Sequence, residues 1–310
     1  MKNPLEPVVA FADRLQRRTT PTAFVVGVVK RYGDDRGGTL AAIVTFYGFL
    51  SVFPLLLLFF TVMAKNFLHL SPAHQARVIE AVLSQFPYFG KDLEQQIHTL
   101  SRNSTVIFVI TFLGLLWGAL GIANALQHAT NTAWRVPRHQ EPALLPRVAR
   151  SLALLGVLAL VMLAGSVLTG LSAAGIAAWG SGSWWLRTLT LVGGAAVNIG
   201  GYLLAFWVLT PSRRDLRVLL PGAVVGGLGW SALQYLGTSL LQHHLTRAGA
   251  LYGVFAVVLG LVFWINLGAQ LFLYATEVNV VADQHLWPRG LTEPAPEIAA
   301  ALRSAEDPPA

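Results

Sequence analysis

Long hydrophobic runs separated by short polar segments dominate the pattern along this chain. The run Ala248–Thr276 contains 29 residues without one Asp, Glu, Lys or Arg. A helix needs about 20 apolar residues to cross the hydrocarbon core of a bilayer, and a buried helix of a soluble protein is rarely so long and so evenly apolar. The run therefore predicts a transmembrane helix, and we interpret the other apolar runs in the same way.

Six such runs predict an all-α integral membrane protein. We expect short interfacial helices in the basic N-terminal segment 1–37 and in the first loop outside the cytoplasm. The six-helix transmembrane domain is expected over 38–285, and the proline-containing residues 286–310 are expected to form a disordered cytoplasmic tail. The spans are predicted at about 39–64, 105–133, 148–171, 186–209, 218–241 and 252–280.

Composition agrees with a membrane protein and excludes several kinds of chemistry. Hydrophobic residues make up 54% of the chain and charged residues 12%, about half the charged share of a soluble domain. The chain has no cysteine, so disulfides, thiolate metal ligands and cysteine nucleophiles are excluded. The first apolar run is too long for a cleaved signal peptide and is expected to act as an uncleaved anchor.

The distribution of positive charge predicts the orientation in the membrane. Six spans place both termini on one side, and 16 of the 22 Lys and Arg residues lie in the segments on that side. Because cytoplasmic loops carry the excess of Lys and Arg, both termini are expected in the cytoplasm, with the spans in the inner (plasma) membrane. Orientation also explains the net charge of +7, so we expect membrane lipids as partners, envelope proteins or a second copy as candidates, and no nucleic acid.

Polar residues recur at helical spacing on one face of the second and the sixth span, near their cytoplasmic ends. Intramembrane ionisable residues are functional candidates by default, so the pattern favours a cytoplasm-facing polar cleft between these two spans. We expect Glu277 and Arg135 to pair near its mouth. Alternatively, the polar residues are hydrogen-bonding contacts between helices. The candidate cleft residues are Asn124, His128, Asn131, Arg135, Asn266, Gln270 and Glu277.

The first span carries a proline and the second a pair of glycines. Tyr47, Ser51 and Pro54 share one face, and a kink is expected at Pro54 because proline cannot donate to the preceding turn. The Ser51 hydroxyl can donate to the Tyr47 carbonyl oxygen. Gly114 and Gly118 have the GxxxG spacing that allows close helix packing.

Four segments resemble the YihY/virulence-factor BrkB family of bacterial inner-membrane proteins. They are AAIVTFYGFLSVFPLLL (41–57), NALQHATNTAW (124–134), LLPGAVVGGLGW (219–230) and ALYGVFAVVLGLVFWINLGAQLFLYATEVN (250–279). The resemblance covers most of residues 30–285 and implies six helices and a role in the cell envelope. The residues that carry it are Tyr47, Ser51, Pro54, Pro221, Gly222, Tyr252, Gly253, Glu277 and Asn279.

The sequence gives little support to an enzyme. It contains no Walker A motif, no G-x-S-x-G nucleophile elbow and no cluster of His, Asp and Glu suited to a metal nuclease. We therefore expect no catalytic residue, no metal and no cofactor. The function favoured is a transporter or lipid-handling protein; the alternatives are a non-catalytic scaffold for envelope integrity or assembly, and a ribonuclease, a label that some family members have carried.

Overall fold

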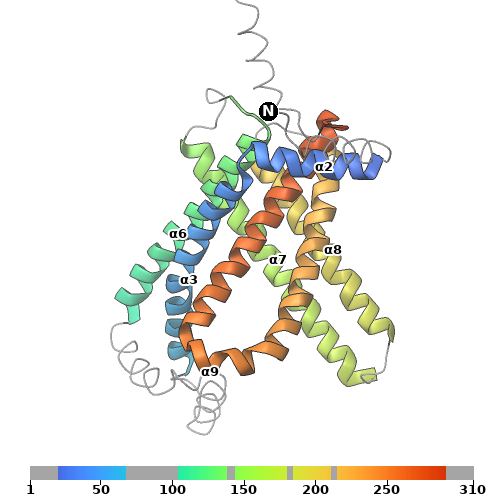
Figure 1. Cartoon of the computed structure of the whole chain (residues 1–310). Helices are drawn as coiled ribbons and strands as arrows, with labels where there is room; N and C mark the ends of the chain where they lie inside the picture. The colour runs from blue at the N-terminus through green and yellow to red at the C-terminus, as the bar shows by residue number, and fades with distance from the viewer. Residues whose placement is uncertain (1–19, 68–103, 138–143, 180–183, 211–214, 291–310) are drawn as a thin grey trace, which may run out of the picture. The chain divides into compact units, whose positions relative to one another are not determined.

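The computed structural model is helical throughout its regular structure and confirms the all-α fold class (Figure 1). It describes residues 20–67, 104–137, 144–179, 184–210 and 215–290. The helices are α2 (Thr20–Asp34), α3 (Gly37–Phe67), α6 (Ser104–Ala133), α7 (Leu144–Trp179), α8 (Trp184–Leu209) and α9 (Leu216–Gln284). The helices expected in the first loop lie outside the described residues, as does the tail from residue 291 onward.

Among the described residues, six stretches are long and apolar enough to cross a membrane, which confirms the predicted number of spans. The N-terminal helix α2 is separate from these stretches, within the segment expected to contain interfacial helices. The stretches are Gly37–Leu57, Val109–Ala133, Leu145–Leu168, Thr188–Leu209, Leu216–Gly237 and Val258–Gln284.

The chain divides into two compact units. The smaller unit is Val44–Ile122, and the larger unit combines Met1–Ile43 with Ala123–Ala310. In the smaller unit, α3 packs against α6 at glycines. A Cβ on Gly118 would lie only 3.1 Å from the Ser51 Cβ, so a larger side chain there would push the helices apart. The glycine pair predicted to allow close packing therefore does so.

Tyr47 and Ser51 lie in this contact of the smaller unit. The Ser51 hydroxyl donates to the Tyr47 carbonyl oxygen over 2.7 Å, as the spacing predicts. The Tyr47 ring lies over Gly121, 2.9 Å from the position that a Cβ there would take. Pro54 lies on the same face of α3, 3.4 Å from the corresponding position on Gly114. The three residues singled out in the first span thus form its contact with α6.

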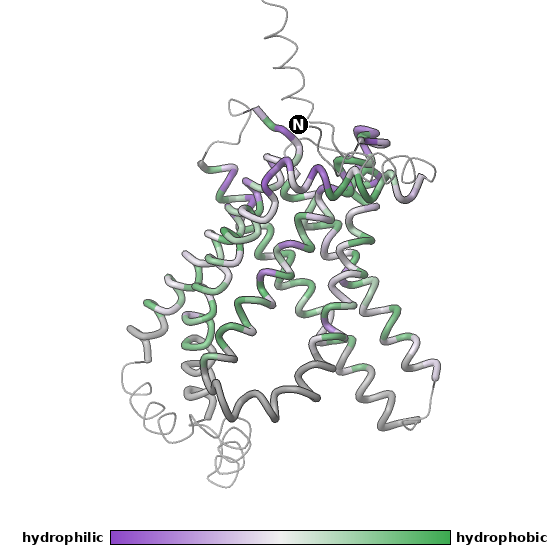
Figure 2. Tube along the Cα trace, viewed as in Figure 1, coloured by the Kyte–Doolittle hydropathy of each residue, from purple (hydrophilic) through white to green (hydrophobic). Residues whose placement is uncertain are grey.

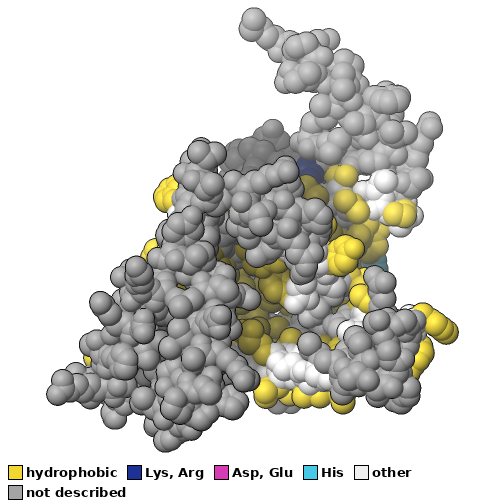
Figure 3. Space-filling model, turned by 90° about the horizontal axis from the view of Figure 1, so that it is seen from below, with side chains coloured by type: hydrophobic (Ala, Val, Ile, Leu, Met, Phe, Trp, Pro, Cys, Tyr) yellow, Lys and Arg dark blue, Asp and Glu magenta, His cyan; other side chains and the backbone are white. Residues whose placement is uncertain are grey.

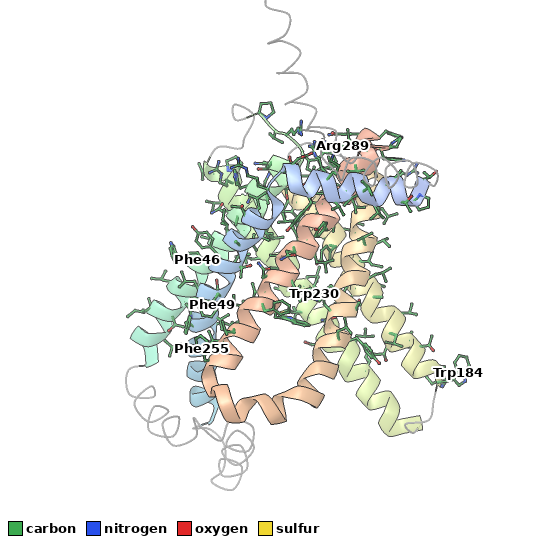
Figure 4. All side chains as sticks on the ribbon, viewed as in Figure 1. Phe46, Phe49, Trp184, Trp230, Phe255 and Arg289 are labelled. Atoms are coloured by element: carbon green, nitrogen blue, oxygen red, sulfur yellow. The ribbon has the colours of Figure 1, made fainter. Side chains whose placement is uncertain are left out.

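In the larger unit, α9 folds back on itself. We call its two spans, 216–237 and 258–284, the first arm and the second arm. Gly222 lies against Asn279, whereas Gly237 lies against Trp264. The partner's residue number falls as the glycine's number rises, so the arms are antiparallel. Figure 1 shows this course, and Figure 4 shows Trp230 between the arms.

The core of the larger unit lies where α8 packs against α9 on one side and α7 on the other. The rings of Phe206 and Phe272 are 5.1 Å apart, and Tyr202 is 6.1 Å from Phe272. On the α7 side, a Cβ on Gly193 would lie 3.3 Å from Leu168. Aromatic rings therefore fill the space between α8 and α9, whereas a glycine allows α8 to approach α7 closely.

The helix α2 lies across the ends of the long helices of its own unit and contacts α9 (Figure 1). Its residue Val28 is buried against Val278 and Val281 of the second arm. The Phe24 ring meets the Trp287 ring edge-on, with centroids 5.2 Å apart. Hydrophilic residues gather at this end of the unit, whereas hydrophobic and intermediate residues (green and white in Figure 2) predominate along the described parts of the arms of α9.

Large hydrophobic side chains cover much of the outer surface of the spans. Met162, Leu163 and Leu191 are 76%, 65% and 65% exposed. In Figure 3 the described side chains are mostly hydrophobic or uncharged. Exposed apolar side chains of this kind suit a lipid environment, in which the helices satisfy their own backbone polar groups.

Gly222→Ala is expected to weaken the contact between the arms of α9. A Cβ at this position collides with the Ala275 carbonyl oxygen and lies 2.6 Å from the Asn279 Cγ. Overpacking of this kind costs about 1–3 kcal/mol. Thermal unfolding of the full chain in detergent measures the loss.

Gly260→Ala is the matched control in the same helix, because nothing lies within 4 Å of the added Cβ. Alanine is favoured over glycine in a helix by about 1 kcal/mol, so this variant should be at least as stable as the original chain. Equal losses in the two variants would contradict the packing argument.

Candidate functional site

The Arg31 side chain is the centre of a buried ion-pair cluster in the larger unit. Although it carries a full charge, the residue is only 2% exposed. Its Nη2 donates to the Ala133 carbonyl oxygen over 2.9 Å. Its Nε lies 3.1 Å from Asp35 Oδ2 and 3.7 Å from Glu277 Oε2. One guanidinium group therefore joins α2, the end of α6 and the second arm of α9. We call Arg31, Asp35 and Glu277 the ion-pair cluster.

Local structure explains how these three side chains meet. Arg31 lies in the last turn of α2, where a positive charge interacts favourably with the helix dipole. Asp35 follows four residues later, within the turn that leads to α3. That turn is made by Arg36, which has a left-handed backbone with φ of 52°. Glu277 lies about two turns before the end of α9.

A second set of contacts holds α2 to the segment after α9. Lys30 Nζ donates to the Gly290 carbonyl oxygen over 2.6 Å. Arg289, labelled in Figure 4, donates to Asp34 Oδ2 over 2.5 Å. Residues 286–290, placed in the tail by the sequence, thus pack against the N-terminal helix. The two described ends of the chain therefore lie on the same side of the larger unit.

Asn279 fastens the two arms of α9 to each other next to the cluster. The Gly222 N–H donates to Asn279 Oδ1 over 2.7 Å, and Asn279 is almost fully buried. The close approach depends on glycine, because a side chain at position 222 would occupy the space of the amide. The Glu-x-Asn sequence of the second arm thus supplies one residue to the ion pair and one to the contact between the arms.

The polar face of α6 divides into exposed and buried positions. Asn124 and His128 are exposed, whereas Asn131 is buried. The Ser151 hydroxyl of α7 lies 3.4 Å from Asn124 Oδ1 and accepts a hydrogen bond of 2.9 Å from Gln127 Nε2. Part of the α6 polar face therefore interacts with α7.

On the second arm of α9, Asn266 and Gln270 form a hydrogen bond with each other. Gln270 Nε2 donates to Asn266 Oδ1 over 2.5 Å, and both side chains are half-buried. These two residues are one helical turn apart, so the bond lies along the arm.

Arg135 lies two residues beyond the end of α6 and acts electrostatically on the cluster. It has a left-handed backbone with φ of 52°, which costs a non-glycine residue about 1–2 kcal/mol. Burial raises the pKa of Asp35 above its ordinary value of 3.8, while the positive charges of Arg31 and, less strongly, Arg135 oppose that rise. The predicted pairing of Arg135 with Glu277 stays a prediction, and Arg31 is a partner of Glu277 that the sequence did not suggest.

A family model described as "Virulence factor BrkB" matches residues 28–297. The chain belongs to the BrkB family. This confirms the resemblance drawn from the four sequence segments, and it agrees with a multi-pass membrane protein with six candidate spans.

Relatives of this BrkB-family chain cover most of its length. Inner membrane protein YhjD of Escherichia coli (strain K12) is 25% identical over 94% of this chain and 90% of its own length. Putative ribonuclease-like protein YfkH of Bacillus subtilis (strain 168) is 23% identical, over 84% of this chain and 94% of its own. A UPF0761 membrane protein of Cronobacter sakazakii (strain ATCC BAA-894) is 26% identical, over 88% and 93%. No solved structure matches the chain.

The BrkB motif residues fall into both units. Tyr47, Ser51 and Pro54 make the helix contact of the smaller unit. Gly222, Glu277 and Asn279 lie at the polar end of the larger unit. Pro221 lies inside the first arm of α9 and is exposed. The surroundings of Tyr252 and Gly253 lie outside what the structure describes.

Sequence reasoning missed Arg31 and Asp35 as site residues of this BrkB-family protein. Both lie in the segment predicted to be basic and interfacial, because Lys and Arg next to a first span ordinarily signal topology. The available signal was their spacing of four residues, which is that of an ion pair on a helix, close to the residues Gly27 and Val28. That spacing indicates an ion pair on the buried face, but not its partner Glu277.

Arg31→Met is expected to destabilise the protein strongly, because it leaves the Glu277 carboxylate buried without its cation. Removing one partner of a buried ion pair costs about 3–5 kcal/mol. Chemical or thermal unfolding of the full chain in detergent measures the effect. Arg36→Met, at an exposed position of the same turn, is the control and should change stability by at most about 0.5 kcal/mol.

The double variant Arg31→Met with Glu277→Met removes both charges and should recover a large part of the stability lost in Arg31→Met. If Arg31→Met is no more harmful than Arg36→Met, the cluster does not hold α2 to α9.

Proposed function

We propose that this protein is an inner-membrane transporter or lipid-handling protein, and that its working region is the polar end of the larger unit. The observation that carries the proposal is Glu277, a buried carboxyl group within a candidate span. A charged side chain within a bilayer span costs about 2.5–3.5 kcal/mol at the centre. Packing alone does not require such a group, so a functional role accounts for it better.

The polar residues on the neighbouring spans extend this region. Asn124 and His128 are exposed within a candidate span of α6, and Asn266 and Gln270 are half-buried on the second arm of α9. Exposed polar side chains at such positions are unfavourable in lipid. We therefore propose that they line a water-accessible cleft that opens toward the cytoplasm and leads to the ion-pair cluster.

Two observations support the proposed orientation. Lys30 and Arg289 tie α2 to the segment after α9, so both described ends lie on one side. The 16 Lys and Arg residues on that side, against 6 on the other, favour the cytoplasm. YhjD is named an inner membrane protein, and we propose the same membrane, with cytoplasmic termini, for this chain.

The second candidate function is a non-catalytic scaffold for envelope integrity or assembly, with envelope proteins or a second copy as partners. The bonds of Asn279 to Gly222 and of Gln127 to Ser151 favour it. In both, a polar side chain serves as a contact between helices, as in many membrane bundles.

A ribonuclease is the third candidate, because the relative YfkH is named a putative ribonuclease-like protein. RNA cleavage that disappears with His128→Ala would favour it over both membrane roles. His128 offers the comparison because it is an exposed histidine on the polar face of α6.

Cysteine labelling tests the proposed cleft. The chain has no cysteine of its own, so single cysteines at positions 124, 128, 266 and 270 can be treated with a membrane-impermeant thiol reagent from each side. The proposal expects labelling from the cytoplasmic side, because the thiol at each position meets water.

Met162→Cys is the matched control, since this side chain is 76% exposed but lies on an apolar surface; it should not react from either side. Arg36→Cys, exposed at the α2–α3 turn, should react from the cytoplasm only. If none of the four polar positions is labelled while Arg36→Cys reacts, the scaffold is favoured. If Arg36→Cys reacts from the outside, the proposed orientation is overturned.

A further inference from the structure

The ion-pair cluster contains two carboxyl groups for one buried cation. The side chains of Asp35 and Glu277 are 10% and 5% exposed, and both face Arg31 Nε. Asp35 Oδ2 and Glu277 Oε2 are buried and have no hydrogen-bond partner among the described residues. The buried part of the cluster therefore has one positive charge and two carboxyl groups, and the facing oxygen of each carboxyl group forms an ion pair but no hydrogen bond.

Asp35 Oδ2 and Glu277 Oε2 lie 3.1 Å and 3.7 Å from the same Arg31 nitrogen, so the two carboxyl groups lie close together. An ionised carboxylate can only accept a hydrogen bond, so one of these groups can donate to the other only when it carries a proton. Two carboxylates that share a site cannot both ionise easily, because like charges repel. One proton makes the buried set of Arg31, Asp35 and Glu277 electrically neutral.

The surrounding charges offset the repulsion between the two carboxyl groups only in part. From the end of α6, Arg135 acts on both carboxyl groups, but it is half-exposed, so solvent screens part of its charge. From α2, Asp34 adds negative charge near Asp35, and it is paired with Arg289. The nearest fully buried cation is therefore Arg31, and it faces two acids.

We propose that Asp35 and Glu277 form a proton-binding site that holds one proton between them, and that binding and release of this proton are coupled to the transport cycle. The coupling role rests on the function proposed above, whereas proton binding does not. Since Arg31 contacts α2, the end of α6 and α9, gain or loss of the proton changes the interaction that joins these three elements.

The sign of the pH dependence follows from the buried carboxyl group outside the spans. Burial raises the pKa of Asp35 above 3.8, so the folded chain binds this proton more tightly than the unfolded chain. The stabilisation is complete below pH 3.8 and is lost as the pH rises through the raised pKa.

Infrared difference spectroscopy tests the site directly. The full chain, reconstituted in vesicles of phosphatidylethanolamine and phosphatidylglycerol, is titrated from about pH 5 to about pH 9, above the ordinary carboxyl range. The proposal expects a carboxylic acid C=O band that disappears during this titration. Carbon-13 labelling of Asp or Glu carboxyl groups in the unaltered chain assigns the band without any risk of misfolding.

The band should be lost in Asp35→Asn and in Glu277→Gln, and it should persist in Asp283→Asn, the control on the second arm. Absence of the band from the unaltered chain, or its survival in both cluster variants, overturns the proton site.

The coupling role has a separate readout. The labelling rate of a cysteine at position 266 should change at least about fivefold over the titration, the lower end of ordinary coupling between sites. Glu277→Gln should remove that change. If the band titrates but the cysteines at the polar positions never react, the proton site stands and the transport proposal is overturned. If the cysteines react but no band is seen, the transport proposal stands and the proton site is overturned. A labelling rate independent of pH despite the band overturns coupling alone.

Discussion

The buried guanidinium of Arg31 is the interaction on which the polar end of the larger unit depends. It is nearly inaccessible to solvent and contacts a backbone oxygen of α6 and carboxyl groups from the α2–α3 turn and α9. A desolvated cation is tolerated only when such partners surround it. The short helix α2, too short to cross a bilayer, is thereby fixed to the spans. The bonds of Lys30 and Arg289 complete its attachment.

Close helix contacts through glycine are the second constraint, and they operate in each unit separately. Lipid chains are as apolar as leucine, so helices in a membrane gain more from intimate packing and hydrogen bonding than from burial. Gly118 brings α6 up to Ser51 in the smaller unit, and Gly222 brings the first arm of α9 up to Asn279 in the larger unit. In the second case the approach is close enough for an amide side chain to bond the backbone. Glycine here permits a polar contact as well as a tight one.

The apolar runs were sufficient to predict the six spans, because a stretch of about 20 apolar residues matches the thickness of a bilayer and is rare in soluble proteins. Helical periodicity also predicted two packing features of the smaller unit. These are the face shared by Tyr47, Ser51 and Pro54, and the spacing of Gly114 and Gly118. The candidate site was less accessible. Glu277 stood out as a carboxylate in an apolar run, but its partner Arg31 lies in a segment whose basic residues have an ordinary explanation as topology signals. Periodicity relates residues within one helix, whereas this pair joins two ends of the chain.

The location of the cluster limits what a proton there can do. Glu277 precedes the end of α9 by seven residues, about 10 Å of helix. With α2 at the membrane surface, as we propose, a proton reaches it without crossing the hydrocarbon core. By itself the site cannot carry a proton across the membrane; it can only alter the contact among α2, α6 and α9. Any coupling must therefore arise because the proton changes the contact among α2, α6 and α9. That change would move or release α2 and so alter access to the polar faces of the spans.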